Sequence, residues 1–206
     1  MRNGARVTLS GWGRVPALEA EQLLDEELRS AARDACLTRG LGRSYGDASL
    51  PRRAGARVAG SRRADRLLAF DATTGVVRAE AGLSLAQLHD LFLPLGFVSP
   101  VAPGTEHVTL GGMVAADVHG KNHHTAGSFG AHLRAVRMLL PDGREVEASA
   151  QQEPELFHAT QGGMGLTGHV LEAEVALERI PSRWIWQESE PVRDLTELLE
   201  KLALAS

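Results

Sequence analysis

A single cysteine, Cys36, occurs among the 206 residues, so the chain cannot form an intrachain disulfide. Its neighbours Ala35 and Leu37 are apolar, and we expect the thiol to be buried as a small hydrophobic group. No apolar run approaches the roughly 20 residues of a transmembrane helix, and no apolar core follows residues 1–4. No transmembrane segment and no secretory signal are therefore predicted, which favours a cytoplasmic protein.

The sequence also lacks a sustained basic stripe. Its net charge is −4, from 22 lysines and arginines against 26 aspartates and glutamates. The closest approach is a group of six arginines, which we interpret as a solvated loop because dedicated nucleic-acid binders have a stronger basic bias. Contact with an anionic substrate or a lipid headgroup is the alternative. The six are Arg52, Arg53, Arg57, Arg62, Arg63 and Arg66.

The length and the hydrophobic content of 43% suit one domain, or two small lobes that share a core. Residues 17–33 carry Leu18, Leu23, Leu24 and Leu28 at helical spacing, with acids early and arginines late. This pattern predicts an amphipathic helix that is well oriented for its own dipole.

The rest of the chain mixes strands and helices, which predicts an α+β fold. Ser84 is a good N-cap for a helix over 85–93, and the Asp-Gly pair at 142–143 predicts a hairpin. A helical pattern over 192–204 stops close to Ser206, and we interpret this ending as a cut at the start of a further domain. The expected strands are 36–38, 76–81, 135–140, 144–148 and 169–180, and a short helix is expected over 155–160.

Glycine is concentrated rather than scattered, and much of it falls in three clusters. We call these the first cluster (Arg39–Gly46), the second cluster (Pro103–Gly130) and the third cluster (Gly162–Gly168). Glycine is used where the backbone takes a positive φ or must approach something closely. Three clusters spread along the chain predict one elongated ligand that several loops contact.

The first cluster does not have the spacing of a dinucleotide fingerprint, because the third glycine would fall at Tyr45. It also lacks the Gly-Lys-Ser/Thr ending of a nucleoside-triphosphate loop. What remains is a run of backbone N–H groups able to form an anion nest, with Arg39 and Arg43 adding positive charge. A diphosphate fits that description, and an ordinary tight turn is the alternative.

The second cluster contains His119, His123 and His124 within six residues. A zinc helix would need a glutamate after His119, and Gly120 opposes a helix there. We therefore expect no metal, and we expect one or two of these side chains to line a polar active site. Gly111 and Gly112 allow close approach of a ligand to the backbone. The third cluster leads into a strand that could bond a ligand edge, or it is simply a flexible connection.

Together, the three clusters resemble the FAD-binding domain of the vanillyl-alcohol-oxidase type, the FAD-linked oxidases. The resemblance implies a two-lobed α+β domain over residues 8–180, with mixed and antiparallel sheets and flanking helices. Its small lobe would cover about 8–100 and its second lobe about 101–180, and 181–206 would begin a truncated substrate domain. The first cluster would hold the FAD diphosphate, the second would follow the flavin, and the third would hold the adenine end.

Residue by residue, the resemblance implies a cofactor-binding set and a smaller catalytic set. Tyr45, His119 and Lys121 would lie nearest the flavin ring and the substrate. No histidine stands in the first cluster, where many relatives attach FAD covalently, so noncovalent FAD is expected. The cofactor-binding set is Arg39, Gly40, Leu41, Gly42, Arg43, Ser44, Tyr45, Gly46, Gly104, Thr109, Leu110, Gly111, Gly112, Ala116, Asp117, Val118, His119, Gly120 and Val170.

Three segments are most similar to the branch of the family that oxidises the ribose 2-hydroxyl of decaprenylphosphoryl-ribose in cell-wall biosynthesis. They are RGLGRSYGD (39–47), HGKNHHTAGSFG (119–130) and GLTG (165–168). This implies a sugar or polyprenyl-phosphoryl sugar substrate, a reductase partner that completes an epimerase, and membrane association through the lipid-linked substrate. An alditol or aldonolactone oxidase, a noncatalytic FAD-binding module and a metal- or phosphate-binding protein are the alternatives.

Overall fold

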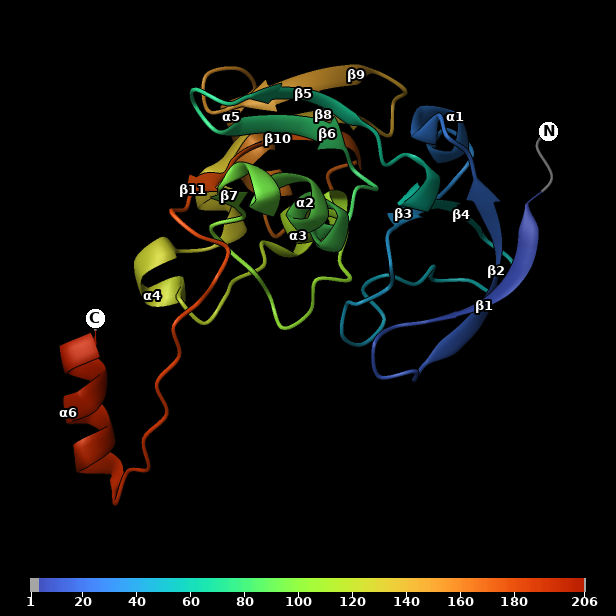
Figure 1. The fold of residues 1–206 in the computed structure, drawn as a ribbon. Coiled ribbons are helices and arrows are strands. Elements are labelled where there is room, and N and C mark those ends of the chain that lie inside the picture. The colour runs from blue at the N-terminus through green and yellow to red at the C-terminus, as the bar shows by residue number, and fades with distance from the viewer. Residues whose placement is uncertain (1–3, 206) are drawn as a thin grey trace.

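A computed structural model describes residues 4–205 as two main sheets with flanking helices (Figure 1). The first sheet is mixed. β1 pairs with β2 in antiparallel fashion, whereas β2, β4 and β3 run parallel to one another. Its strands, in the order β1-β2-β4-β3, are β1 (Ala5–Ser10), β2 (Ala17–Leu24), β4 (Arg57–Gly60) and β3 (Leu37–Arg39).

The second sheet is antiparallel throughout. Its strands, in the order β5-β6-β10-β8-β9, are β5 (Leu67–Asp71), β6 (Val76–Glu80), β10 (His169–Ala176), β8 (Leu133–Leu139) and β9 (Glu145–Ser149). The short strands β7 (Phe97–Val98) and β11 (Glu178–Arg179) pair separately. A mixed sheet and an antiparallel sheet with helices confirm the predicted α+β fold.

The helices α2 and α3 lie on one face of the five-stranded sheet, whereas α6 stands apart at the end of an exposed segment (Figure 1). As predicted, α2 begins with Ser84, which makes a complete capping box with Gln87. The helices are α1 (Leu28–Ala32), α2 (Leu85–Phe92), α3 (Leu110–Ala116), α4 (His123–Ala126), α5 (Pro154–Thr160) and α6 (Leu195–Ala205), with 3-10 turns η1 (Ser61–Arg63), η2 (Leu93–Leu95) and η3 (Phe129–His132).

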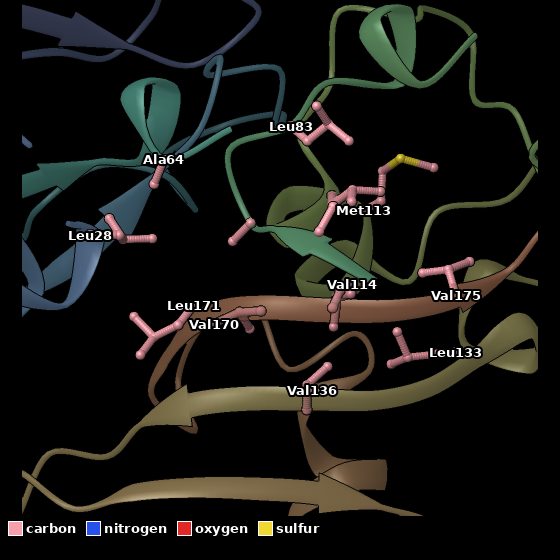
Figure 2. Close-up of a cluster of buried hydrophobic side chains, with 14 of the residues drawn as sticks. Leu28, Ala64, Leu83, Met113, Val114, Leu133, Val136, Val170, Leu171 and Val175 are labelled. Atoms are coloured by element: carbon pink, nitrogen blue, oxygen red, sulfur yellow. The ribbon is translucent and has the colours of Figure 1, made fainter. Parts of the chain in front are cut away.

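The main core lies between the five-stranded sheet and α3, and it continues toward α1 (Figure 2). Val114 of α3 packs with Val136 of β8 in this core, both almost completely buried. The register of β10 against β8 shifts at Leu171, so that both Val170 and Leu171 are buried in succession. Figure 2 shows Leu171 on the side of β10 that lies toward Leu28, which extends the core to the first sheet.

Charged side chains of the five-stranded sheet form one continuous ion-pair chain. It alternates arginine and glutamate, and its neighbouring charged atoms lie 2.8–2.9 Å apart. It joins α1 to strands β9, β8, β10 and β6. In order, its members are Arg29, Glu145, Arg137, Glu172, Arg78 and Glu147. We call this set the charge ladder.

The helix expected over 17–33 is wrong, because Ala17–Leu24 forms strand β2 and only Leu28–Ala32 is helical. β2 lies between β1 and β4, and its two faces contribute to different cores. Ala20 packs in a small cluster with Leu9, whereas Leu23 joins the main core. A strand that is buried on both faces does not alternate cleanly, so its leucines imitated helical spacing.

One further expectation differs from the structure. Cys36 is exposed rather than buried, and its thiol donates a hydrogen bond to the Arg57 carbonyl at 3.2 Å.

The change from one sheet to the other comes between Gly60 and Leu67. From there on, β6 pairs with the distant β10 rather than with the first sheet. The lobe boundary near residue 100 and the division of the chain into an FAD-binding domain and a substrate domain stay predictions.

A side-chain hydrogen bond joins the two sheets. Thr38 Oγ1 of β3 and His169 Nδ1 of β10 lie 2.7 Å apart. Burial lowers the pKa of His169 below its ordinary value, so the fold favours the neutral ring. The unfolded chain therefore binds a proton at a higher pH than the folded chain does, and folding stability must fall as the pH drops through the window between the two pKa values.

We expect His169→Gln to remove part of the loss of stability that wild-type protein shows on acidification below about pH 6.5, the ordinary histidine value. The measurement is the free energy of unfolding in urea, taken at intervals from about pH 8 to pH 5. His158→Gln, an exposed histidine on α5, is the matched control. An unchanged pH profile in His169→Gln would show that this ring does not contribute to acid sensitivity.

Candidate functional site

The first cluster continues from the end of β3, at an edge that it shares with the end of β4. Because β3 and β4 are parallel, with Arg39 opposite Gly60, both chain segments leave the sheet on the same side. None of the backbone N–H groups of residues 40–46 donates a hydrogen bond to another described residue. Such a run of uncommitted donors beside the carboxyl ends of parallel strands is a typical anion-binding arrangement.

The Arg39 side chain binds two segments that flank this loop. Its guanidinium donates to the Ser10 carbonyl at 2.6 Å, to the Ser49 carbonyl at 3.1 Å and to Ser49 Oγ at 2.8 Å. Gly42 has a φ of 68°, and a side chain there would collide with the Arg39 guanidinium. Burial, and next the positive charge of Arg62, lower the pKa of Arg39. No carboxylate among the described residues pairs with Arg39, so its positive charge is left without a counter-charge.

Arg43 joins the first cluster to two other segments. Its Nε donates to the His107 carbonyl at 3.3 Å, and its guanidinium lies 5.2 Å from the centre of the Trp12 ring. The Trp12 amide in turn donates to the Ser44 carbonyl at 2.9 Å. Trp12 therefore lies beside the first cluster and belongs to the candidate site. The sequence did not indicate it, because a single tryptophan between two strands forms no motif.

Helix α3 lies within the second cluster, and Thr109 is its N-cap. The Gly112 amide donates to Thr109 Oγ1 at 3.3 Å, while Leu110 and Gly111 donate to the carbonyls of Leu83 and Ala81. The first amides of this helix are therefore bound by protein. Thr109 also faces Gly40, where a side chain would collide with its hydroxyl. This contact places the first cluster against the start of α3.

The glycines of this segment differ in what surrounds them. A side chain at Gly111 would lie 2.9 Å from Ala81 Cβ, so packing alone explains that glycine. A side chain at Gly112 would meet only Thr109 Oγ1 at 3.2 Å, and one at Gly104 would meet no atom within 4 Å. Neither Gly104 nor Gly112 has a positive φ. The fold itself therefore does not explain the glycine at 104, and it constrains position 112 only through the Thr109 hydroxyl.

The third cluster docks on the opposite end of α3. The amides of Gly162 and Met164 donate to the carbonyls of Val114 and Ala115 at 3.0 and 2.8 Å. Asp117 follows in the left-handed region with a φ of 41°, and its Oδ1 accepts a hydrogen bond from Gly130 N at 2.7 Å. The two ends of one short helix thus bring the first and third clusters to the second.

His119 and Lys121 are exposed beyond this end of α3. The backbone of His119 bridges to Ser128, and the His119 ring lies 5.4 Å from that of His123. Among the described residues no group of three possible metal ligands converges. Tyr45 is 83% exposed, and no contact among the described residues joins it to His119 or Lys121. The contacts described above join the first cluster to the start of α3, and they do not bring the three predicted catalytic residues together.

The other residues of the predicted cofactor-binding set differ in how far they are buried. The Val170 side chain is buried in the core (Figure 2), which leaves only its backbone for a ligand. Gly120 is buried against the Ala102 carbonyl, where a side chain would lie 3.0 Å away. Leu41, Ser44 and Val118 are half-buried, and Gly46 and Ala116 are exposed.

No helix among residues 4–205 has the length and apolar character needed to cross a membrane.

Comparison with known proteins gives three findings. The sequence model of the family described as "FAD binding domain" matches residues 18–149. Decaprenylphosphoryl-beta-D-ribose oxidase of Mycolicibacterium smegmatis is 40% identical over 180 residues, covering 82% of this chain and 39% of that protein. Delta(24)-sterol reductase of Mus musculus is 28% identical over 141 residues, covering 68% of this chain and 27% of that protein. The chain thus spans two fifths or less of the length of these relatives.

Among solved structures, an alkyldihydroxyacetonephosphate synthase matches with a TM-score of 0.69 and 20% sequence identity. The match covers 79% of this chain and 35% of that one. At this identity the likeness concerns the fold alone.

Proposed function

The chain belongs to the FAD-binding domain family of the FAD-linked oxidases, and from this we infer that it holds FAD in an oxidoreductase. The observation that carries the inference is the first cluster. Its amides from 40 to 46 are uncommitted, and the Arg39 charge beneath them has no carboxylate partner. Backbone donors and fixed positive charge are what a diphosphate needs. Gly104 and Gly112 add two positions where a flat ligand can approach the backbone.

The finer proposal is oxidation of a secondary alcohol on a sugar, with the ribose 2-hydroxyl of a polyprenyl-phosphoryl ribose as the substrate. The 40% identity to decaprenylphosphoryl-beta-D-ribose oxidase and the His119–His124 segment support it. Bound FAD would supply the hydride acceptor. A reductase partner would then complete an epimerase. Oxidation of a soluble alditol or aldonolactone is the competing activity, and comparing turnover on the two substrate classes decides between them.

The chain's own residues would bind and orient in this reaction. We propose that the cofactor-binding set given above lies along FAD, with Arg43 at the diphosphate and Val170 at the adenine end through its backbone. His119 and Lys121 are exposed and close in sequence, so they would orient a sugar hydroxyl from the substrate side. Tyr45, also exposed, would lie on the same side of the ring.

We expect FAD to bind noncovalently, because the first cluster contains no histidine to carry a covalent link. Purified protein loaded with FAD is denatured in acid and centrifuged, and the absorbance of flavin is read in both fractions. The flavin should appear in the supernatant. Yellow colour in the pellet would mean a covalent bond, and no uptake of FAD on titration would count against the proposed function itself.

Gly112→Ala should weaken FAD binding by about tenfold or more and should destabilise the apo-protein less than Gly111→Ala does. The added methyl group would face the side proposed for the cofactor, and its only contact in the fold is the Thr109 hydroxyl at 3.2 Å. Alanine inside a helix is also favoured over glycine by up to about 1 kcal/mol. Gly111→Ala, one residue earlier, is the comparison and should destabilise the apo-protein by roughly 1–3 kcal/mol, because it overpacks against Ala81. The measurements are FAD titration and urea unfolding of both variants. Wild-type affinity in Gly112→Ala would contradict the assignment.

The catalytic proposal is tested at the position of His119 in a full-length relative. His119→Ala should lower turnover per bound flavin by about 10²-fold if the imidazole serves as acid or base, with FAD content near normal. His124→Ala, an exposed histidine of the same segment, is the control and should have a much smaller effect. A loss of FAD in proportion to activity would instead assign His119 to fixing the loop.

A further inference from the structure

The six arginines of residues 52–66 do not form one surface. Arg57 pairs with Glu21 at 3.1 Å, and Arg66 pairs with the buried Glu80 at 2.6 Å. Arg52, Arg53, Arg62 and Arg63 have no carboxylate partner among the described residues. The first two precede β4 and the last two follow it, so β4 separates the unpaired arginines into two pairs at opposite edges of the first sheet.

Arg62 lies at the edge from which the first cluster emerges. It is the second residue of η1, which begins directly after β4, and β4 ends opposite Arg39 in the parallel register. The side chain is exposed and makes no hydrogen bond to another described residue. The pKa of Arg39 is lowered first by burial and second by the positive charge of Arg62. Both guanidinium groups thus belong to residues at the same edge of the first sheet, and no carboxylate among the described residues pairs with either.

Arg39 and Arg62 differ in the hydrogen bonds that their guanidinium groups make. Arg39 uses its guanidinium to hold the carbonyls of Ser10 and Ser49, so it fixes the backbone of the loop. Arg62 has all of its donors available. Two like charges at one edge repel each other, and an anion bound between or beside them would offset that repulsion. The uncommitted amides of residues 40–46 begin at the same place and would serve the same anion.

We propose that Arg62 is a further binding residue of this site and that its guanidinium binds the diphosphate of the cofactor, while Arg39 positions the loop. This inference rests on the proposed function, because the diphosphate is that of FAD. It adds a residue from outside the three glycine clusters, carried by the turn after β4. Arg63 follows on the same turn, and successive residues of a 3-10 turn point about 120° apart, so it is directed elsewhere.

The test compares Arg62→Gln with Arg63→Gln in binding titrations of FAD and of ADP, which keeps the diphosphate but has no flavin. Losing a charge-assisted hydrogen bond of about 1.5–3 kcal/mol corresponds to a rise in Kd of about tenfold to a hundredfold. We expect that rise for both ligands in Arg62→Gln, and less than about a twofold change in Arg63→Gln. The melting temperature of apo Arg62→Gln should be unchanged or raised, because the repulsion of Arg39 is relieved.

Three outcomes would overturn the inference, and they can be told apart. Wild-type affinity of Arg62→Gln for both ligands would remove Arg62 from the site and leave the proposed function standing. Equal losses in Arg62→Gln and Arg63→Gln would show a general effect of charge rather than a contact. If wild-type protein binds neither FAD nor ADP, the proposed function and this inference both fail.

Discussion

Hydrogen bonds from distant parts of the chain hold the short helix α3 at both ends, and the arrangement of the site depends on them. At its start the carbonyls of Ala81 and Leu83 accept from the first amides, and at its end Gly162 and Met164 donate to the last carbonyls. A helix of seven residues is marginal by itself, so its position is set by these partners and by burial of Met113 and Val114. The three glycine clusters meet because α3 belongs to the second cluster, while the first and third clusters contact its two ends.

A glycine in this site can leave room for a neighbouring residue or leave the backbone open to a ligand, and the sequence alone does not separate these two roles. Gly40 and Gly111 leave room for Thr109 and Ala81, Gly112 meets only the Thr109 hydroxyl at 3.2 Å, and Gly104 has no neighbour within 4 Å. In the sequence all four belong to the same kind of cluster, and the clusters alone predicted a ligand that several loops contact. Only the surroundings of each residue show which glycines the protein itself needs. The uncommitted amides of the first cluster were expected from the pattern, and Trp12 beside them was not.

The fold was predictable where local signals agree with the final packing. The capping box at Ser84 and the Asp-Gly turn at 142–143 are local, and both elements formed as expected. β2 was missed because its burial on both faces depends on β1, on β4 and on the core beyond them. Cys36 has apolar neighbours in sequence but lies at an exposed position before β3, so its neighbours did not report its environment. Contacts between distant residues decided these cases, and no short window of sequence contains them.

The charge ladder affects the electrostatic potential around the protein. It holds three arginines and three glutamates in alternation, so its summed charge is zero and it produces little field in solution. Although the chain is acidic overall, the edge with Arg39 and Arg62 keeps positive charge that no carboxylate cancels. Local potential, rather than net charge, governs the approach of a small dianion. Positive charge at that edge of the first sheet would therefore attract a small dianion despite the negative net charge of the chain.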